Sequence, residues 1–162
     1  MGLEAHRDRR FRHRERRAQL VGIWLVAALL VAGVLGLFGA TGPLSARVVG
    51  SADRMLSVEY QRFPHQHAET SIRVTVPDEA VRSDRTAVGL SASWMDATQV
   101  SSVSPEAVEQ IVGADGIWLA LATTPGASLT LTINYRPTDA GSRPGWVQVG
   151  TSRAAFHQFV YL

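Results

Sequence analysis

An uncharged apolar run near the N-terminus constrains this chain more than any other feature. Residues 20–40 are 21 consecutive positions without a charged or strongly polar side chain. As an α-helix, a run of that length measures about 31 Å, which matches the hydrocarbon core of a bilayer. We therefore predict one transmembrane helix over residues 20–41.

A cleaved signal peptide is the alternative interpretation of this run. The run is longer than the usual apolar core of a signal peptide, which has about 7–15 residues. Two candidate cleavage sites, after Ala40 and Ala46, place the bulky residues Phe38 and Leu44 where the cleavage motif has a small one. The pattern favours an anchor that stays attached.

The positive charge of the chain is concentrated before the apolar run. Residues 1–19 contain seven arginines and three acidic residues, whereas residues 43–162 contain nine arginines and eleven acidic residues. By the positive-inside rule, residues 1–19 form a cytoplasmic arm and the C-terminal part lies outside the membrane. Because that part is slightly acidic, we expect no nucleic-acid partner. All basic residues are arginine, a bias typical of a GC-rich genome, so the predicted location is a bacterial cytoplasmic membrane.

Small residues recur at every fourth position of the apolar run. They are Ala28, Ala32, Gly36 and Ala40. Such a stripe lets a second helix approach closely, which predicts association with a membrane-protein partner or with a second copy of the chain. The alternative is that a run this rich in glycine and alanine contains the stripe by chance.

The remainder of the chain shows the alternation of β-strands. Residues 42–53 are predicted to be a linker and a first edge segment, followed by a domain over residues 54–162. Apolar residues occupy every second position in several short segments, with turn-forming residues between them. About seven or eight such segments predict an all-β fold, an immunoglobulin-like antiparallel β-sandwich after one N-terminal transmembrane helix. Residues that share a face include Leu56, Val58 and Tyr60; Ile72, Val74 and Val76; Val88, Leu90, Ala92 and Trp94; and Leu129, Leu131, Ile133 and Tyr135.

Finer features of this domain are also predicted. The short link at residues 123–127 indicates that segments 116–122 and 128–135 pair as a hairpin. Residues 104–111 fit either one helical turn or a strand. Trp94 and Trp118 are predicted to lie in the core, with a flat aromatic platform for sugars as the alternative.

Three short motifs of the domain resemble those of a known protein group. They are Val-Glu-Tyr-x-Arg-Phe at residues 58–63, a Leu-Thr-Ile-Asn-Tyr strand followed by a turn with Pro and Gly, and the terminal Phe-His-Gln-Phe-Val-Tyr at residues 156–161. They resemble a group of small bacterial membrane proteins of uncharacterised function, with one N-terminal span and an extracytoplasmic β-domain. Members are often encoded near a multi-spanning membrane protein, which implies such a partner. The group tends to end in proline after the tyrosine, whereas this chain ends in Leu162.

Catalytic motifs are missing from the sequence. The chain has no cysteine and no lysine, and it contains no Gly-x-Ser-x-Gly segment. Thiol nucleophiles, Cys-ligated metals, the Ser-x-x-Lys pair and the lysine-containing phosphate loop are therefore excluded. We predict a protein that is not an enzyme and that carries no cofactor.

Histidines supply the best candidate for a metal site. His65 and His67 flank a glutamine, and in an extended chain both imidazoles would lie on one side. His157, on the last predicted strand, could complete a copper or zinc site. The alternative is that this His-x-His segment is a solvated loop. The sequence thus leaves an extracytoplasmic metal-binding or chaperone domain as one alternative function, and a module that binds an envelope polymer as another.

Aromatic residues near the C-terminus predict a partner interface. Arg62, Phe63, Phe159 and Tyr161 are of the types that anchor protein interfaces. The last residues are apolar up to Leu162, so the C-terminus is expected to be docked, most simply on its own domain. The preferred hypothesis is a membrane-anchored accessory or assembly protein whose outer domain binds a membrane protein.

Overall fold

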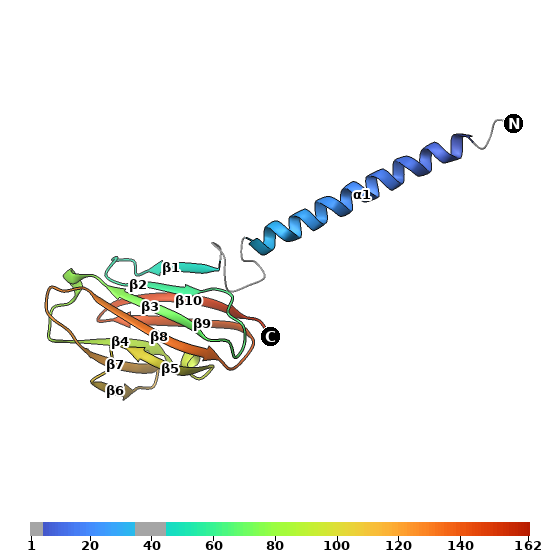
Figure 1. The fold of residues 1–162 in the computed structure, drawn as a ribbon. Helices are drawn as coiled ribbons and strands as arrows, with labels where there is room; N and C mark the ends of the chain where they lie inside the picture. The colour runs from blue at the N-terminus through green and yellow to red at the C-terminus, as the bar shows by residue number, and fades with distance from the viewer. Residues whose placement is uncertain (1–4, 35–44) are drawn as a thin grey trace.

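The computed structural model describes residues 5–34 and 45–162. One long helix, α1, runs from Ala5–Val34 and is followed by a β-domain (Figure 1). No helix within these described residues combines the length and apolar character needed to cross a membrane. The last part of the predicted span, residues 35–41, lies outside the described residues.

The β-domain consists of two five-stranded sheets packed face to face (Figure 1). The first sheet has the strand order β1-β2-β3-β8-β5, and the second has the order β10-β9-β4-β7-β6. Neighbouring strands are antiparallel in both sheets, which confirms the predicted antiparallel β-sandwich. The strands are β1 (Ala46–Gly50), β2 (Ser57–Gln61), β3 (Thr70–Val76), β4 (Arg85–Ser91), β5 (Thr98–Ser104), β6 (Glu109–Val112), β7 (Gly116–Ala122), β8 (Leu129–Pro137), β9 (Gly141–Val149) and β10 (Ser152–Val160).

Alternating side chains fill the space between the sheets. In β3, Ile72, Val74 and Val76 are buried while Arg73 lies outside, as the period of two requires. In β8, Leu131 and Ile133 are fully buried in the same layer. The predicted inward positions of these strands are therefore confirmed.

The predicted hairpin of residues 116–122 and 128–135 is wrong. β7 pairs with β4 and β6 in the second sheet, whereas β8 pairs with β3 and β5 in the first. The intervening loop crosses from one sheet to the other, and the Gly126 N–H donates to the Val81 carbonyl there. A short link shows that two strands are close but does not show whether they share a sheet.

The tryptophans also differ in part from the expectation. Trp94 is in the core at 1% exposure, but it lies on a short helix, α2 (Ala92–Met95), because β4 ends at Ser91. Trp118 is only half-buried, on the outer face of the second sheet. Its indole lies over Gly89, where an added Cβ would come within 2.8 Å of the ring. Because Gly89 has no side chain, the Trp118 ring can pack directly on the neighbouring strand, outside the core.

Residues 104–111, predicted as a helical turn or a strand, end in the edge strand β6. The sequence pattern missed β5, because its residues do not alternate strictly between apolar and polar. β5 also contains an irregular register between Val100 and Ser102 against β8. A bulge of that kind shifts the side-chain phase by one residue, which erases the period of two.

A buried polar network closes one end of the core. Gln158 on β10 is 1% exposed, and its Oε1 accepts a hydrogen bond from Trp94 Nε1 at 2.9 Å. Its Nε2 donates to the Tyr135 hydroxyl at 2.6 Å and to the Gln61 carbonyl at 2.7 Å. Burial raises the pKa of Tyr135 to about 12. Each polar atom of the glutamine amide therefore has a partner, as a buried amide requires.

Candidate functional site

The four residues predicted to form a partner interface lie together at one end of the sandwich. The Phe63 and Tyr161 rings are 6.0 Å apart between centroids, and the Phe159 and Tyr161 rings are 5.2 Å apart. The guanidinium carbon of Arg62 lies 5.0 Å from the centre of the Phe63 ring. His65 joins the group, with its ring 6.0 Å from that of Tyr161. We call these five residues the aromatic end.

Backbone hydrogen bonds hold the two segments of the aromatic end together. The N–H of Phe159 donates to the Arg62 carbonyl at 2.8 Å, and the N–H of Tyr161 donates to the Pro64 carbonyl at 2.9 Å. His65 and Tyr161 form an isolated parallel bridge. The segment after β2 thus leaves the first sheet and extends the second along β10. The last strand is docked on its own domain up to Tyr161, as expected.

The aromatic end retains exposed apolar surface. Phe159 is 43% exposed and Leu162 is 94% exposed, whereas Phe63 and Tyr161 are half-buried. The buried side chains of the same strand, Phe156 and Val160, point into the core. Apolar side chains that are exposed next to one another mark candidate interfaces, and Phe159 lies against the half-buried Tyr161.

The chain enters the domain next to the aromatic end. The N–H of Arg62 donates to the carbonyl of Ser45 at 2.7 Å, and Ser45 is the first described residue after α1. Figure 1 shows the C-terminus at the same end of the sandwich as the start of β1.

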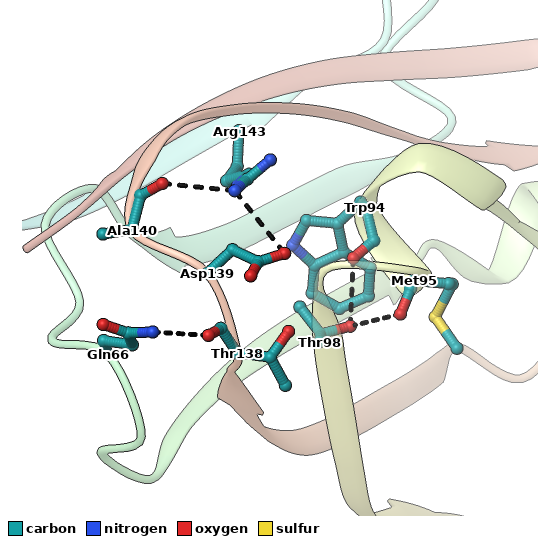
Figure 2. Close-up of polar contacts among 8 residues, drawn as sticks. All are labelled: Gln66, Trp94, Met95, Thr98, Thr138, Asp139, Ala140 and Arg143. Carbon is teal, nitrogen blue, oxygen red and sulfur yellow. Dashed lines mark hydrogen bonds and ion pairs between the residues drawn. The ribbon is translucent and has the colours of Figure 1, made fainter.

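Loops beside the aromatic end are fixed by polar contacts (Figure 2). Gln66 Nε2 donates to the Thr138 carbonyl at 2.5 Å, which ties the loop after β2 to the β8–β9 connection. Arg143, near the start of β9, donates to the Ala140 carbonyl at 3.2 Å and lies 3.6 Å from the Asp139 carboxylate. Thr98 Oγ1 donates to the Trp94 and Met95 carbonyls, which fixes the exit from α2. The Gln66 contact thus connects the loop that carries His65 to the β8–β9 connection.

The three histidines of the predicted metal site occupy different surroundings. His65 contacts Tyr161, while His67 is exposed in a left-handed backbone conformation with φ of 61°. His157 precedes Tyr161 by four residues, about 13 Å along a strand, and its Nε2 lies 2.7 Å from Ser142 Oγ. In the described part of the chain, no three His, Asp or Glu side chains gather closely enough to hold a metal ion. The structure therefore does not bring His65, His67 and His157 together.

The Ser142–His157 pair resembles half of a hydrolytic site, but it lacks the surroundings of one. Both side chains lie on the exposed outer face of β9 and β10. Within the described residues, no carboxylate forms an ion pair with His157 to orient its ring. The pair fits a cross-strand contact on a solvated face.

The predicted helix stripe is described only in part. Ala28 is exposed and Ala32 is half-buried on α1, whereas Gly36 and Ala40 lie outside the described residues.

A pocket that the sequence did not predict lies at the opposite end of the sandwich. Its volume is about 540 Å³, and its walls come from the β1–β2 loop, the segment before β4, the outer face of the second sheet and the β9–β10 turn. The residues that give it its chemical character are Asp53, Arg82, Arg85, Trp118, Thr151 and Ser152. We call it the arginine pocket. No sequence motif marks it, because its residues come from four separate segments.

Asp53 connects two walls of the arginine pocket. Its carboxylate accepts hydrogen bonds from the hydroxyls of Ser152 and Ser51 and from the N–H of Met55. The bond from Ser152, then those from Ser51 and Met55, lower the pKa of Asp53 below its usual value. The side chain therefore stays ionised and fastens the β1–β2 loop to the β9–β10 turn.

The similarity of this chain to known proteins is found among solved structures. No family model matches the chain, and no curated protein matches it. Among solved structures, the chain is similar to the crystal structure of the S-layer protein SbsC domains 4 and 5, with a TM-score of 0.40 and 13% sequence identity. The match covers 72% of this chain and 53% of that one, so the chain spans about half the length of that solved chain.

Proposed function

We propose that this protein is a non-enzymatic accessory or assembly protein of a bacterial membrane complex. An N-terminal helix anchors it in the cytoplasmic membrane, and its extracytoplasmic β-domain binds a membrane protein through the aromatic end. The observation that carries the proposal is the gathering of Arg62, Phe63, Phe159 and Tyr161 into one partly exposed patch beside the point where the chain enters the domain.

The exposed side chains of α1 support the anchor. Seven apolar side chains of this helix that are more than half exposed together cover every side of it: Leu20, Val21, Ile23, Trp24, Leu25, Val26 and Leu29. A helix that is apolar all round needs an apolar environment, either lipid or another protein.

The position of the aromatic end supports a partner in the membrane. From residue 41, where the predicted span ends, to Ser45 the chain can reach at most about 14 Å. Because Arg62 is hydrogen-bonded to Ser45, the aromatic end would lie close to the membrane surface. A protein partner is favoured over the lipid surface itself, since residues 43–162 have more acidic residues than arginines and anionic lipids attract basic segments.

Site-specific crosslinking tests the interface. A photoreactive phenylalanine analogue is placed at Phe159 in the full-length chain, and the crosslinked products from native membranes are identified by mass spectrometry. Val112, an exposed apolar residue on the distant edge strand β6, provides the matched control position. From position 159 we expect an adduct that contains one copy of this chain and one copy of a membrane protein, and from position 112 we expect no such adduct.

Two outcomes of the crosslinking would contradict the proposed interface. Adducts with lipid alone would mean that the bilayer covers the aromatic end, and equal adducts from both positions would mean that the contact is unspecific.

A substitution provides a second test. Phe159→Ser should reduce co-purification of the crosslinked partner at least tenfold, because aromatic anchors carry much of the energy of an interface. The unfolding midpoint of this variant checks that the fold is intact.

A further inference from the structure

The arginine pocket carries an inference that does not depend on the membrane anchor. It lies at the end of the sandwich away from the aromatic end, since β10 begins with Ser152 in the pocket and leads to Tyr161 at the other end. Nine residue steps along a strand separate the two sites by about 30 Å. A volume of about 540 Å³ is within the range of pockets that hold small molecules.

The charges of the pocket are unbalanced. Among the described residues, its ionisable side chains are Arg82, Arg85 and Asp53. Neither arginine forms an ion pair within the part of the chain that the structure describes. Asp53, in contrast, already accepts three hydrogen bonds from protein donors. The pocket therefore presents two guanidinium groups whose donors are available to a ligand.

The walls that carry the arginines are held in place. Ser83 Oγ donates to the Arg85 carbonyl at 2.5 Å, and Thr123 Oγ1 donates to the Ser83 carbonyl at 2.9 Å. The Thr86 and Thr123 hydroxyls are 3.1 Å apart. On the opposite wall, the Asp53–Ser152 contact fixes the β9–β10 turn. Fixed walls lower the entropic cost of binding, because little chain must be ordered by the ligand.

Trp118 adds an apolar wall beside the arginines. Its ring lies over Gly89 and faces the same outer surface of the second sheet as Arg85 and Ala87. Arginine forms paired, charge-assisted hydrogen bonds with carboxylate and phosphate oxygens, and an indole packs against a ring or an apolar chain. We propose that the arginine pocket binds a small ligand whose carboxylate or phosphate group is held by Arg82 and Arg85 and whose apolar part lies against Trp118.

Titration of the full-length protein in detergent tests the pocket. Citrate provides the carboxylate probe and pyrophosphate the phosphate probe, each compared with sodium chloride at the same ionic strength so that screening is equal. Binding is followed by calorimetry and by tryptophan fluorescence. We expect saturable binding of at least one probe at one site per chain. The probe that binds more tightly identifies the chemistry of the anionic group.

Matched variants locate the binding. The double variant Arg82→Gln with Arg85→Gln should weaken binding at least tenfold, whereas Arg73→Gln on the first sheet should leave it unchanged. Ala87→Glu is an independent variant, since it places a carboxylate in the pocket wall and should also weaken binding. Circular dichroism melting checks that each variant folds. Binding of neither probe, or binding that survives in the double variant, would overturn the proposal.

Discussion

The two ends of the β-sandwich use polar groups in opposite ways. At the aromatic end, Gln158 is buried and every polar atom of its amide has a protein partner, while the exposed surface is apolar. At the other end, Arg82 and Arg85 are exposed and form no ion pair among the described residues, and the exposed Asp53 accepts hydrogen bonds from the hydroxyls of two buried serines.

The difference concerns solvent more than the number of hydrogen bonds. Gln158 and Asp53 each make three hydrogen bonds to other residues, but the Gln158 side chain is buried at 1% exposure whereas Asp53 is exposed to water. Removing a buried partner leaves other buried groups unsatisfied, whereas water replaces a lost partner at the surface. We therefore expect the buried Gln158 network to contribute more to stability than the exposed Asp53 carboxylate of the arginine pocket.

The largest predicted effect follows from removing the buried amide. Gln158→Leu should lower the free energy of unfolding by about 3 kcal/mol, because it removes three hydrogen bonds of a buried amide and leaves the buried Trp94 Nε1 without its acceptor. Urea unfolding followed by tryptophan fluorescence measures it. The matched control is Gln148→Leu, a half-buried glutamine of β9 that bonds to Gly150, which should cost no more than about 0.5 kcal/mol. Equal losses in the two variants would abolish the distinction between the ends.

An intermediate effect is expected at alkaline pH. The folded-state pKa of Tyr135, raised by burial to about 12, exceeds that of an unfolded tyrosine near 10. Its contribution to stability is thus complete below pH 10 and is lost as pH rises through 12, by about 2–3 kcal/mol. Urea unfolding midpoints across this window measure the loss. Tyr135→Phe should remove most of it, and an unchanged alkaline slope in that variant would contradict the assignment.

The smallest effect is expected at acid pH and at the other end. Since hydrogen bonds from Ser152, Ser51 and Met55 lower the pKa of Asp53, its contribution is present above the unfolded value near 3.8 and is lost as pH falls through the lower folded value. Urea unfolding midpoints from about pH 6 to about pH 2 measure this loss of stability. Asp53→Asn should slightly reduce the fall of the unfolding midpoint at acid pH. Ser152→Ala should move that fall toward higher pH, because it removes a hydrogen bond that lowers the pKa of Asp53. A loss as large as that for Gln158→Leu would show that this end also governs stability.

Local alternation accounts for the parts of the fold that the sequence predicted. The buried faces of β3 and β8 follow from a period of two, which is a property of each strand alone. The partners of β7 and β8 depend on contacts between distant segments, so their predicted hairpin was wrong. Trp118 illustrates the same limit, since its half-buried position outside the core depends on Gly89 of another strand.

The two candidate sites also differ in whether the sequence alone could predict them. The aromatic end was predictable because Arg62 with Phe63, and Phe159 with Tyr161, form two short and compositionally distinct segments. The arginine pocket was not, because exposed arginines near turns are common and only the fold places Arg82 and Arg85 opposite Asp53 and beside Trp118.

The sequence by itself indicated that the part of the chain after residue 54 consists of strands that each bury one face, because its apolar residues alternate with polar ones. It also showed that positive charge is concentrated in residues 1–19 and that residues 20–40 form one uncharged apolar run. Only the tertiary structure decided which strands are neighbours, that the segment after β2 extends the second sheet along β10, and that Gln158 connects Trp94, Tyr135 and Gln61. The physical reason is that these contacts join residues far apart in the chain, and their energy depends on burial that no local pattern specifies.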